Sequence, residues 1–397
     1  MRKYHIVLLG MILLLLGGLF RYNILGFYHE FLLDEVVDLG GHGVEKVIDV
    51  VMDEEHNMYV LSKTIDGFVN TEGFIENFEQ FLVTKINRKH KVEKSYLVDE
   101  LMDQTTIKLI PSSGEIKLGK NNEVILLLDY DYWNGDIYED NTFFLRMSND
   151  LSPADEVEIP LEERSLMLNF VIGEENQIYL FSSEGKQFIF DEEFQLLEER
   201  IMNIDPFTIL YDFVYKDDSF YFIGKTNESP NYMYVLFKYT LESDSSEVIE
   251  YLGGEHIYYE LTNDYILYAS YDGDRWDQDM LEVTYLNLDD EEDTFTTSCE
   301  LLNKENQVAN IKYNNEHIYV YGYTMTTKRS DATYYAYNIE GEVVDEYISN
   351  IGGLDSMNNL YFYEDTIIPI IASKRVVNFD LIRRYTKAYD HIIKFID

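Results

Sequence analysis

The sequence predicts an all-β protein: a seven-bladed β-propeller preceded by one N-terminal transmembrane helix. Three observations support this prediction: a hairpin pattern that recurs seven times, a composition rich in strand-forming residues, and an apolar run near residue 1. Repetition at a period of a few tens of residues is typical of repeat proteins, and four strands per repeat build a propeller. Six or eight blades remain alternatives, because the first and last repeats are the least regular. A pair of β-sandwich domains is the other alternative, but it predicts no regular column of hairpins.

Each repeat contains a turn rich in Asn or Asp, followed by a short strand of mostly apolar or aromatic residues. The first copy runs from His56 to Ser62 and the last from Asn359 to Tyr363. Asn and Asp tolerate the left-handed backbone conformations that tight hairpins require. Aligning the copies places seven residues in one column: Met58, Val124, Ile178, Phe220, Tyr265, Ile318 and Leu360. The shorter spacings between them fit a four-stranded blade with tight loops, and the longer ones indicate insertions.

The composition agrees with a strand-rich fold that has a large core. Of the 397 residues 46% are apolar, and the aromatic share consists mainly of 34 Tyr and 23 Phe, which favour strands. Cys299 is the only cysteine, so the chain cannot form an intrachain disulfide or a thiolate metal cluster. We expect Cys299 to be a buried, inert thiol.

The chain is strongly acidic, with 74 Asp and Glu against 31 Lys and Arg and a net charge of −43. A field of this sign repels nucleic-acid phosphates and anionic lipid surfaces. Nucleic acid is therefore excluded as an expected partner, whereas cations, cationic peptides and neutral sugars remain. The simpler alternative is a solvated acidic surface that only keeps the protein soluble.

Residues 1–29 are predicted to form a signal anchor. Arg2 and Lys3 lead into the fifteen residues from Ile6 to Phe20, which carry no charge. A cleaved signal peptide would place small residues after this run, but the chain continues with bulky residues and Arg21. The positive-inside rule then predicts a cytoplasmic N-terminus and a large extracytoplasmic domain. A cleaved signal peptide and a peripheral helix are the alternatives.

The rest of the chain divides into a linker with the first strand, residues 30–46, and the propeller, residues 47–397. The last part of the propeller is unusual because it is basic. We expect Val376–Arg384 and His391–Phe395 to be the final two strands. A helix with an apolar stripe is the alternative for this segment.

Two acidic insertions, each with one of the two Trp residues, are the candidate ligand-binding loops. They follow the second strands of repeats two and five, so we expect both on the same face of the ring. Aromatic faces stack on sugars or cations, and carboxylates accept hydrogen bonds from hydroxyl or ammonium groups. The candidate residues are Asp129, Asp131, Trp133 and Asp136 in the first loop, and Asp272, Asp274, Trp276 and Asp277 in the second. Ordinary solvated loops with packed Trp side chains are the alternative.

Calcium is the cofactor that these loops suggest. Closely spaced carboxylates suit Ca²⁺, which takes six to eight oxygen ligands. Asp129, Asp131 and Asp140 match the first, third and twelfth positions of an EF-hand loop, but Trp133 occupies the fifth position. The sequence contains no nucleophile motif, phosphate-binding loop or paired-histidine motif typical of a metal site. It therefore predicts no catalytic residue and no dedicated metal ligands.

From Val47 to Asp397 this hairpin pattern resembles bacterial extracytoplasmic β-propeller proteins with NHL-like or quinoprotein-like repeats. The resemblance is architectural, because the recurring Trp-Asp and paired-Gly signatures of other propeller classes are missing. It implies a membrane-anchored binding or scaffold module for a protein, glycan or cation. The alternative function is an enzyme that acts on a cell-envelope polysaccharide through the acidic face.

Overall fold

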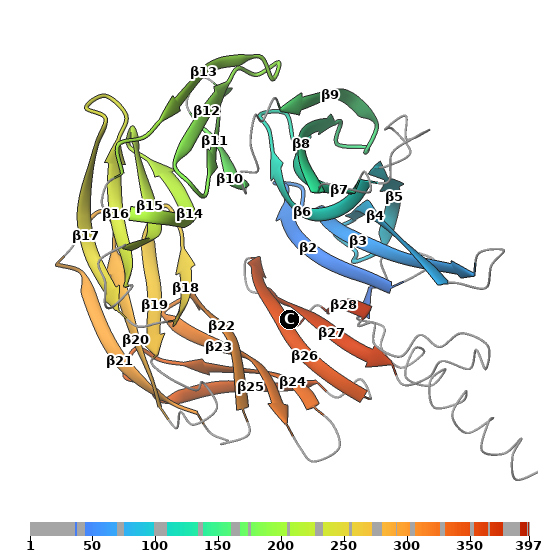
Figure 1. Cartoon of the computed structure of the whole chain (residues 1–397). Coiled ribbons are helices and arrows are strands. Elements are labelled where there is room, and N and C mark those ends of the chain that lie inside the picture. Colours follow the sequence, from blue (N-terminus) through green and yellow to red (C-terminus); the bar gives the residue numbers. More distant parts are fainter. Residues whose placement is uncertain are drawn as a thin grey trace, which may run out of the picture.

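The computed structural model shows a ring of β-sheets around a central axis (Figure 1). It describes residues 36–37, 44–69, 75–98, 109–133, 138–159, 167–173, 176–204, 207–226, 233–253, 256–271, 280–290, 292–301, 306–325, 330–349, 353–363, 366–375, 390–394 and 396. The predicted anchor, residues 1–29, lies outside these ranges. Within them, no helix is long and apolar enough to cross a membrane.

Five sheets contain four antiparallel strands each, paired in sequence order. Unit 1 consists of β2 (Val44–Met52), β3 (Met58–Val69), β4 (Ile75–Ile86) and β5 (Val92–Leu97). Unit 2 consists of β6 (Leu109–Leu118), β7 (Val124–Trp133), β8 (Tyr138–Met147) and β9 (Pro153–Ile159). Unit 3 consists of β10 (Met167–Ile172), β11 (Ile178–Ser182), β12 (Lys186–Phe190) and β13 (Leu196–Ile201). Unit 4 consists of β14 (Phe207–Lys216), β15 (Ser219–Thr226), β16 (Tyr234–Thr240) and β17 (Ser245–Gly253). Unit 5 consists of β18 (His256–Leu261), β19 (Tyr265–Tyr271), β20 (Met280–Asn287) and β21 (Thr294–Glu300).

The sixth sheet has eight strands and closes the ring. Its first half, unit 6, consists of β22 (Asn306–Asn314), β23 (His317–Met325), β24 (Ser330–Tyr337) and β25 (Val343–Ser349). Its second half, the closing unit, consists of β26 (Gly353–Tyr363), β27 (Thr366–Arg375), β28 (Asp390–Lys394) and β1 (Val36–Val37). One parallel pair, Ser330 with Leu354, joins the halves. The outermost strand of the closing unit therefore comes from the beginning of the chain, and its partner β28 comes from the end.

The β-propeller prediction is confirmed. Counted as hydrogen-bonded sheets among the described residues, the ring has six members, the number given above as an alternative to seven. The seventh predicted repeat forms the closing unit within the eight-stranded sheet. His391–Phe395, predicted as the last strand, largely coincides with β28. The other predicted terminal strand, Val376–Arg384, lies outside the described residues.

The predicted hairpin column is correct for six repeats and wrong for the seventh. The first six column residues lie at or next to the start of β3, β7, β11, β15, β19 and β23, the second strands of their units. Leu360, in contrast, lies inside β26, the first strand of the closing unit. The Asn pair before it marks a β-bulge between Met357 and Asn359, and the actual hairpin joins Tyr363 to Thr366. Asn suits a bulge as well as a turn, because both require irregular backbone conformations.

Hydrophobic clusters fill the spaces between neighbouring units. A unit inside the ring packs on both sides, so its central strands are apolar on both faces; β11 and β24 are buried along their whole length. Between units 2 and 3, for example, the rings of Phe144 and Phe194 stack with centroids 5.1 Å apart. Cys299 lies in the cluster between units 5 and 6, where burial raises the pKa of its thiol to about 12. The expected inert thiol is thus explained by packing.

Candidate functional site

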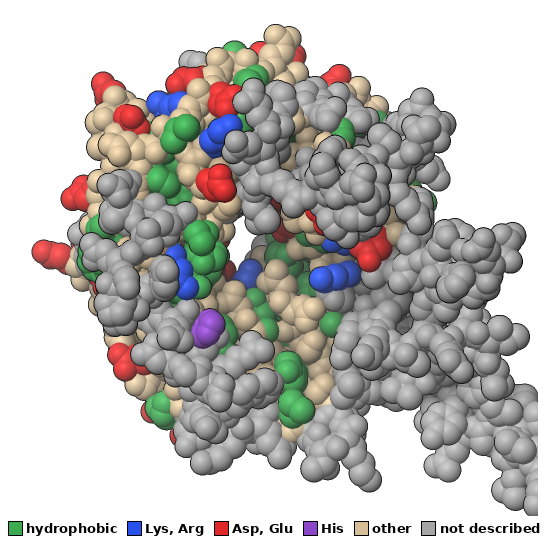
Figure 2. Space-filling view, viewed as in Figure 1, with side chains coloured by type: hydrophobic (Ala, Val, Ile, Leu, Met, Phe, Trp, Pro, Cys, Tyr) green, Lys and Arg blue, Asp and Glu red, His purple; other side chains and the backbone are tan. Residues whose placement is uncertain are grey.

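The first strand of several units carries a polar residue at an equivalent register position. These residues are Asp49, Glu115, Asp212, Asn310 and Asn359, which pair across the hairpin with Leu61, Leu127, Ile223, Tyr321 and Ile370. The first strands form the inner wall of the ring (Figure 1). A space-filling view shows an opening near the ring centre with charged side chains at its wall (Figure 2). Equivalent register positions therefore bring the polar residues together around this channel.

A β-bulge directly precedes four of these residues. The pairing register shifts just before Asp49, Asp212, Asn310 and Asn359. A bulge adds one residue to a strand and changes the direction of the side chains that follow it. The bulges thus allow a polar side chain to face the channel next to residues that pack in the hydrophobic clusters, such as Val50, Phe213 and Ile311.

Hydrogen bonds accepted by these side chains, and by Glu260 on the first strand of unit 5, connect the first strands of neighbouring units. Asp49 accepts a hydrogen bond from Ile116 N (3.1 Å), Glu115 from Phe170 N (2.8 Å) and Asp212 from Asn169 Nδ2 (3.0 Å). Glu260 accepts one from Tyr313 N (2.7 Å), and Asn310 accepts one from Tyr259 N (2.9 Å). Four of these five donors are backbone N–H groups. The channel carboxylates thus link units 1 to 2, 2 to 3, 3 to 4 and 5 to 6.

Two lysines complete a set of six ionisable side chains, the channel cluster: Asp49, Glu115, Lys117, Asp212, Glu260 and Lys312. The Lys117 ammonium lies 2.7 Å from Glu115, and the Lys312 ammonium lies 3.8 Å from Glu260. Lys312 also lies 4.8 Å from the ring centroid of Tyr361, a cation–π contact between unit 6 and the closing unit. Four carboxyl groups against two ammonium groups leave the cluster acidic when all are charged.

Burial controls the protonation of the cluster. It raises the pKa of Glu115 to about 7 and that of Asp212 to about 6, although Lys117 opposes both shifts. Burial likewise raises the pKa of Asp49 and Glu260 and lowers the pKa of Lys312. Burial also opposes the charge on Lys117, but Glu115 and the other carboxylates outweigh it, so the pKa of Lys117 is raised.

These side chains are enclosed by protein yet still reach the channel. The side chains of Glu115 and Glu260 are 16% and 15% exposed, and those of Lys117 and Lys312 are 31% and 18% exposed. Water in the channel therefore reduces the cost of holding the charges. Groups that titrate near neutral pH can exchange protons with a ligand, but the same oxygens hold the strands together. Within the described residues, no three His, Cys, Asp or Glu side chains are arranged to hold a metal ion.

The structure describes part of the first predicted loop, and it forms a hairpin. Asp129 accepts a hydrogen bond from Thr142 Oγ1 at 2.7 Å and another from Ser113 Oγ. Asp131 lies two residues further along β7, opposite Asp140 on β8. Asp129 and Asp131 therefore share one face of this hairpin. Asp129 is already engaged by neighbouring hydroxyl groups.

Trp133 ends β7, where its backbone pairs with Tyr138. Asp136, Asp272, Asp274, Trp276 and Asp277 lie outside the described residues. The second loop connects β19 to β20, which has the same place in unit 5 as the β7–β8 connection in unit 2. A shared binding face for the two loops stays a prediction.

The channel cluster was not predicted from the sequence. Its signal is present in Val47–Val51 and Leu210–Val214, where one Asp interrupts an apolar strand about four residues before a turn. A single strand of this kind is indistinguishable from one with a solvent-facing acid. Only the alignment of the first strands would have revealed a polar column.

A ring of repeated antiparallel sheets around a polar channel defines the class: this chain is a β-propeller protein. It is similar to YCF48 from Cyanidioschyzon merolae, with a TM-score of 0.50 and 10% identity over 91% of this chain and 98% of that one. At this identity the similarity shows the fold alone.

Two further solved structures are more distant. The β-propeller domain of the Trilobed protease from Pyrococcus furiosus has a TM-score of 0.47 and 11% identity over 88% of this chain and 93% of that one. BamB from Moraxella catarrhalis has a TM-score of 0.41 and 9% identity over 91% of this chain and 100% of that one. No protein-family model and no curated protein matches the sequence.

Proposed function

We propose that the protein is a membrane-anchored binding or scaffold module whose propeller lies outside the cytoplasmic membrane. The observation that carries this proposal is the use of the channel carboxylates. Asp49, Glu115 and Glu260 each accept a backbone N–H from the next unit, so these groups stabilise the ring. A ring held together by such bonds, with loops that differ from unit to unit, is an arrangement that suits binding.

The ligand class follows from charge and from the two Trp loops. A net charge of −43 favours cationic or neutral partners: a basic protein surface, a glycan or a cation such as Ca²⁺. Asp129, Asp131 and Asp136, with Trp133, would supply one half of the site. Asp272, Asp274, Trp276 and Asp277 would supply the other half.

Titration of the purified full chain tests the binding role. Glycans, basic peptides and CaCl₂ are added separately, and binding is measured by calorimetry and by the shift in melting temperature. The double variant Trp133→Ala/Trp276→Ala should lose binding while its own melting temperature stays nearly constant. A large loss of stability in this variant would instead assign the rings to packing, because removing a buried Trp costs about 3–5 kcal/mol.

Protease protection tests the placement. Protease added to intact, wall-stripped cells should degrade the propeller, because the basic residues Arg2 and Lys3 favour a cytoplasmic N-terminus. Degradation that requires lysis of the cells would contradict the proposed orientation.

Catalysis on an envelope polysaccharide is the second candidate, and one observation favours it. Glu115 and Asp212 have pKa values raised to about 7 and about 6, as general acids often do. An enzyme would lose turnover in Glu115→Gln or Asp212→Asn while still binding its polymer. In a scaffold the same variants change stability and leave ligand binding intact.

We also propose that the eight-stranded sheet serves as two blades, which gives seven blades in all. In the described residues a hydrophobic cluster lies between each pair of neighbouring units, including one between unit 6 and the closing unit. Another joins the closing unit to unit 1. An experimental structure with two separate blades here would support this count, and one continuous blade would contradict it.

A further inference from the structure

One face of the ring carries the turns from first to second and from third to fourth strands; we call it the turn face. In unit 1 these turns are residues 53–57 and 87–91, each closed by backbone hydrogen bonds. The β26–β27 hairpin of the closing unit reaches the same face. His56 and His90 from unit 1, with Tyr363 and Thr366 from the closing unit, line one cavity of about 340 Å³.

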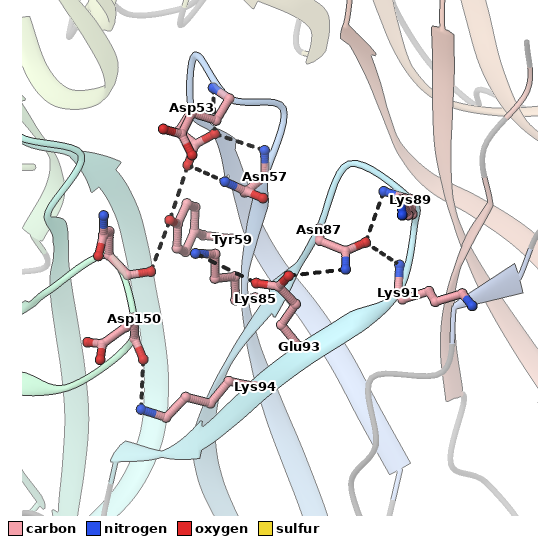
Figure 3. A network of polar contacts seen from close by, with 12 residues as sticks. Asp53, Asn57, Tyr59, Lys85, Asn87, Lys89, Lys91, Glu93, Lys94 and Asp150 are labelled. Carbon is pink, nitrogen blue, oxygen red and sulfur yellow. Dashed lines mark hydrogen bonds and ion pairs between the residues drawn. The ribbon is translucent and has the colours of Figure 1, made fainter.

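The turn between β4 and β5 is basic, although the protein as a whole is strongly acidic. It reads Asn87-Arg88-Lys89-His90-Lys91, and its last four residues, the basic turn, are all exposed. Asn87 fixes the backbone, because its Oδ1 accepts hydrogen bonds from the amides of Lys89 (2.9 Å) and Lys91 (3.2 Å) (Figure 3). The turn is therefore a formed element that presents its cations to solvent.

Three cations of this turn, Arg88, Lys89 and Lys91, are not neutralised by neighbouring side chains that the structure describes. Arg88, Lys89 and Lys91 make no ion pair or side-chain hydrogen bond with any residue the structure describes. The nearby cations are engaged: Lys85 pairs with Glu93 at 3.8 Å, and Lys94 donates to the carbonyl of Asp150 at 2.7 Å (Figure 3). The basic turn thus keeps three full positive charges available.

The equivalent turns of the other units have the opposite sign. Residues 148–152, 191–195, 241–244, 287–293 and 338–342 connect the third and fourth strands of units 2 to 6. Each contains at least one Asp or Glu, and none contains Lys or Arg. Among these third-to-fourth-strand turns, only the one in unit 1 is basic. The first-to-second-strand turns on the same face are of mixed sign: residues 53–57 of unit 1 include the exposed acids Glu54 and Glu55, and residues 119–123 of unit 2 include Lys120.

The chain enters the ring beside this basic place. In β1, Val36 pairs with Lys394 and Val37 with Ile393. Ile396 pairs with Ile367, next to the β26–β27 hairpin, so increasing residue number along β28 leads toward the turn face. Because β1 is antiparallel to β28, the chain reaches Val36 from the turn-face side. The closing unit that contains β1 packs directly on unit 1.

We propose that the basic turn docks on the anionic phospholipid headgroups of the membrane that holds residues 1–29. This inference rests on the membrane anchoring proposed above. An anchor that enters from the turn face brings this face toward the bilayer, with unit 1 next to the point of entry. The ring then tilts so that unit 1 contacts the lipid and the acidic turns of units 3 to 5 point away.

Screening explains how a protein of net charge −43 can bind an anionic surface. At physiological ionic strength the Debye length is about 8 Å, so distant acidic turns contribute little at the contact. The charges within that distance decide the interaction, and clustered Lys and Arg are attracted to anionic lipid when a membrane segment holds them nearby. Raised salt should therefore weaken the docking and leave the anchoring unchanged.

Fluorescence quenching on vesicle-reconstituted full chain tests the proposal. Val92→Cys places a fluorophore beside the basic turn, because Val92 is the first residue of β5 and is 38% exposed. Leu196→Cys and Val343→Cys are matched controls, since these residues begin β13 and β25 and are 39% and 38% exposed. Cys299 is buried and does not compete for the label. The quencher is a nitroxide on the lipid headgroup.

In vesicles of phosphatidylcholine and phosphatidylglycerol at about three to one, the Val92 site should be quenched at least about twofold more than either control. This excess should disappear in pure phosphatidylcholine, and also when Arg88, Lys89 and Lys91 are all changed to Ser. Equal quenching at the three sites, or an excess that survives these substitutions, overturns the docking.

Two further measurements separate the docking from its alternatives. Flotation with the vesicles is scored first: a chain that does not float refutes the anchor, whereas a floating chain with equal quenching refutes only the docking. Inorganic phosphate should reduce the excess no more than NaCl of equal ionic strength does. A loss specific to phosphate would assign the basic turn to a soluble phosphate ligand and overturn the lipid proposal.

Discussion

At the scale of single residues, the channel cluster shows how burial and partnership together set protonation. Glu115 accepts a hydrogen bond from a backbone N–H of unit 3 and forms an ion pair with Lys117, yet burial still raises its pKa to about 7. The desolvation of its carboxylate outweighs both favourable contacts. Such a group links stability to pH, since the folded and unfolded chains bind different numbers of protons.

We predict that this linkage makes the protein less stable as pH rises toward neutrality. The ordinary pKa of Glu115 is 4.5, so above this value the unfolded chain loses a proton that the folded chain keeps up to about pH 7. Unfolding then releases a proton, and the free energy of unfolding falls between these pH values by about 1–3 kcal/mol. Asp212 adds to the same trend between 3.8 and about 6. Urea denaturation across this range measures it.

The Glu115→Gln variant should flatten this pH dependence, because Gln keeps the acceptor for Phe170 N and does not titrate. Glu54→Gln, at an exposed turn position, is the matched control and should leave the dependence as it was. An unchanged slope in Glu115→Gln would show that Glu115 is ionised in the folded protein at all these pH values.

At the scale of elements, the strands were predicted well because turns rich in Asn or Asp separate short apolar strands at fairly regular intervals along the sequence. Six of the seven predicted second strands begin where the column residues indicated. The seventh failed because a bulge and a turn use the same residue types, as Asn359 shows. The channel cluster could not be predicted, since it arises from register and from bulges in strands far apart in sequence.

Glycines in the second strands show how closely the first strands approach them. At Gly322 in β23, an added Cβ would overlap the carbonyl oxygen of Gln307 in β22 and lie 2.8 Å from the amide of Ala309. We predict that Gly322→Ala lowers the free energy of unfolding by about 2–4 kcal/mol, because backbone atoms at a bulge cannot move aside cheaply. Denaturant titration provides the measurement.

Gly224 occupies the equivalent place in β15 and supplies the matched control. An added Cβ there would meet Phe237 Cε1 at 2.9 Å, an atom at the far end of a side chain. We expect Gly224→Ala to cost about 1 kcal/mol or less, since a ring can shift where a backbone cannot. Equal losses in the two variants would mean that β22 adapts, and would contradict the proposed close approach.

At the scale of the whole molecule, the net charge lowers the stability of the folded state. A compact ring concentrates the net charge of −43, and this self-repulsion favours the unfolded state. We predict that the melting temperature rises by about 3 °C or more between about 10 mM and 0.5 M NaCl, because salt screens the repulsion. Scanning calorimetry would detect this, and a melting temperature independent of salt would show that the acids are already compensated.

The closure of the ring by β1 and β28 has a consequence for how the protein is made. Val36 pairs with Lys394, so β1 stays without this partner until the much later β28 has been synthesised. Until then the open ring exposes the edge of β27 and the apolar side of unit 1, both of which invite wrong pairing. Only a chain that has been synthesised past β28 can complete the ring. Ring closure therefore distinguishes chains that contain β28 from chains truncated before it.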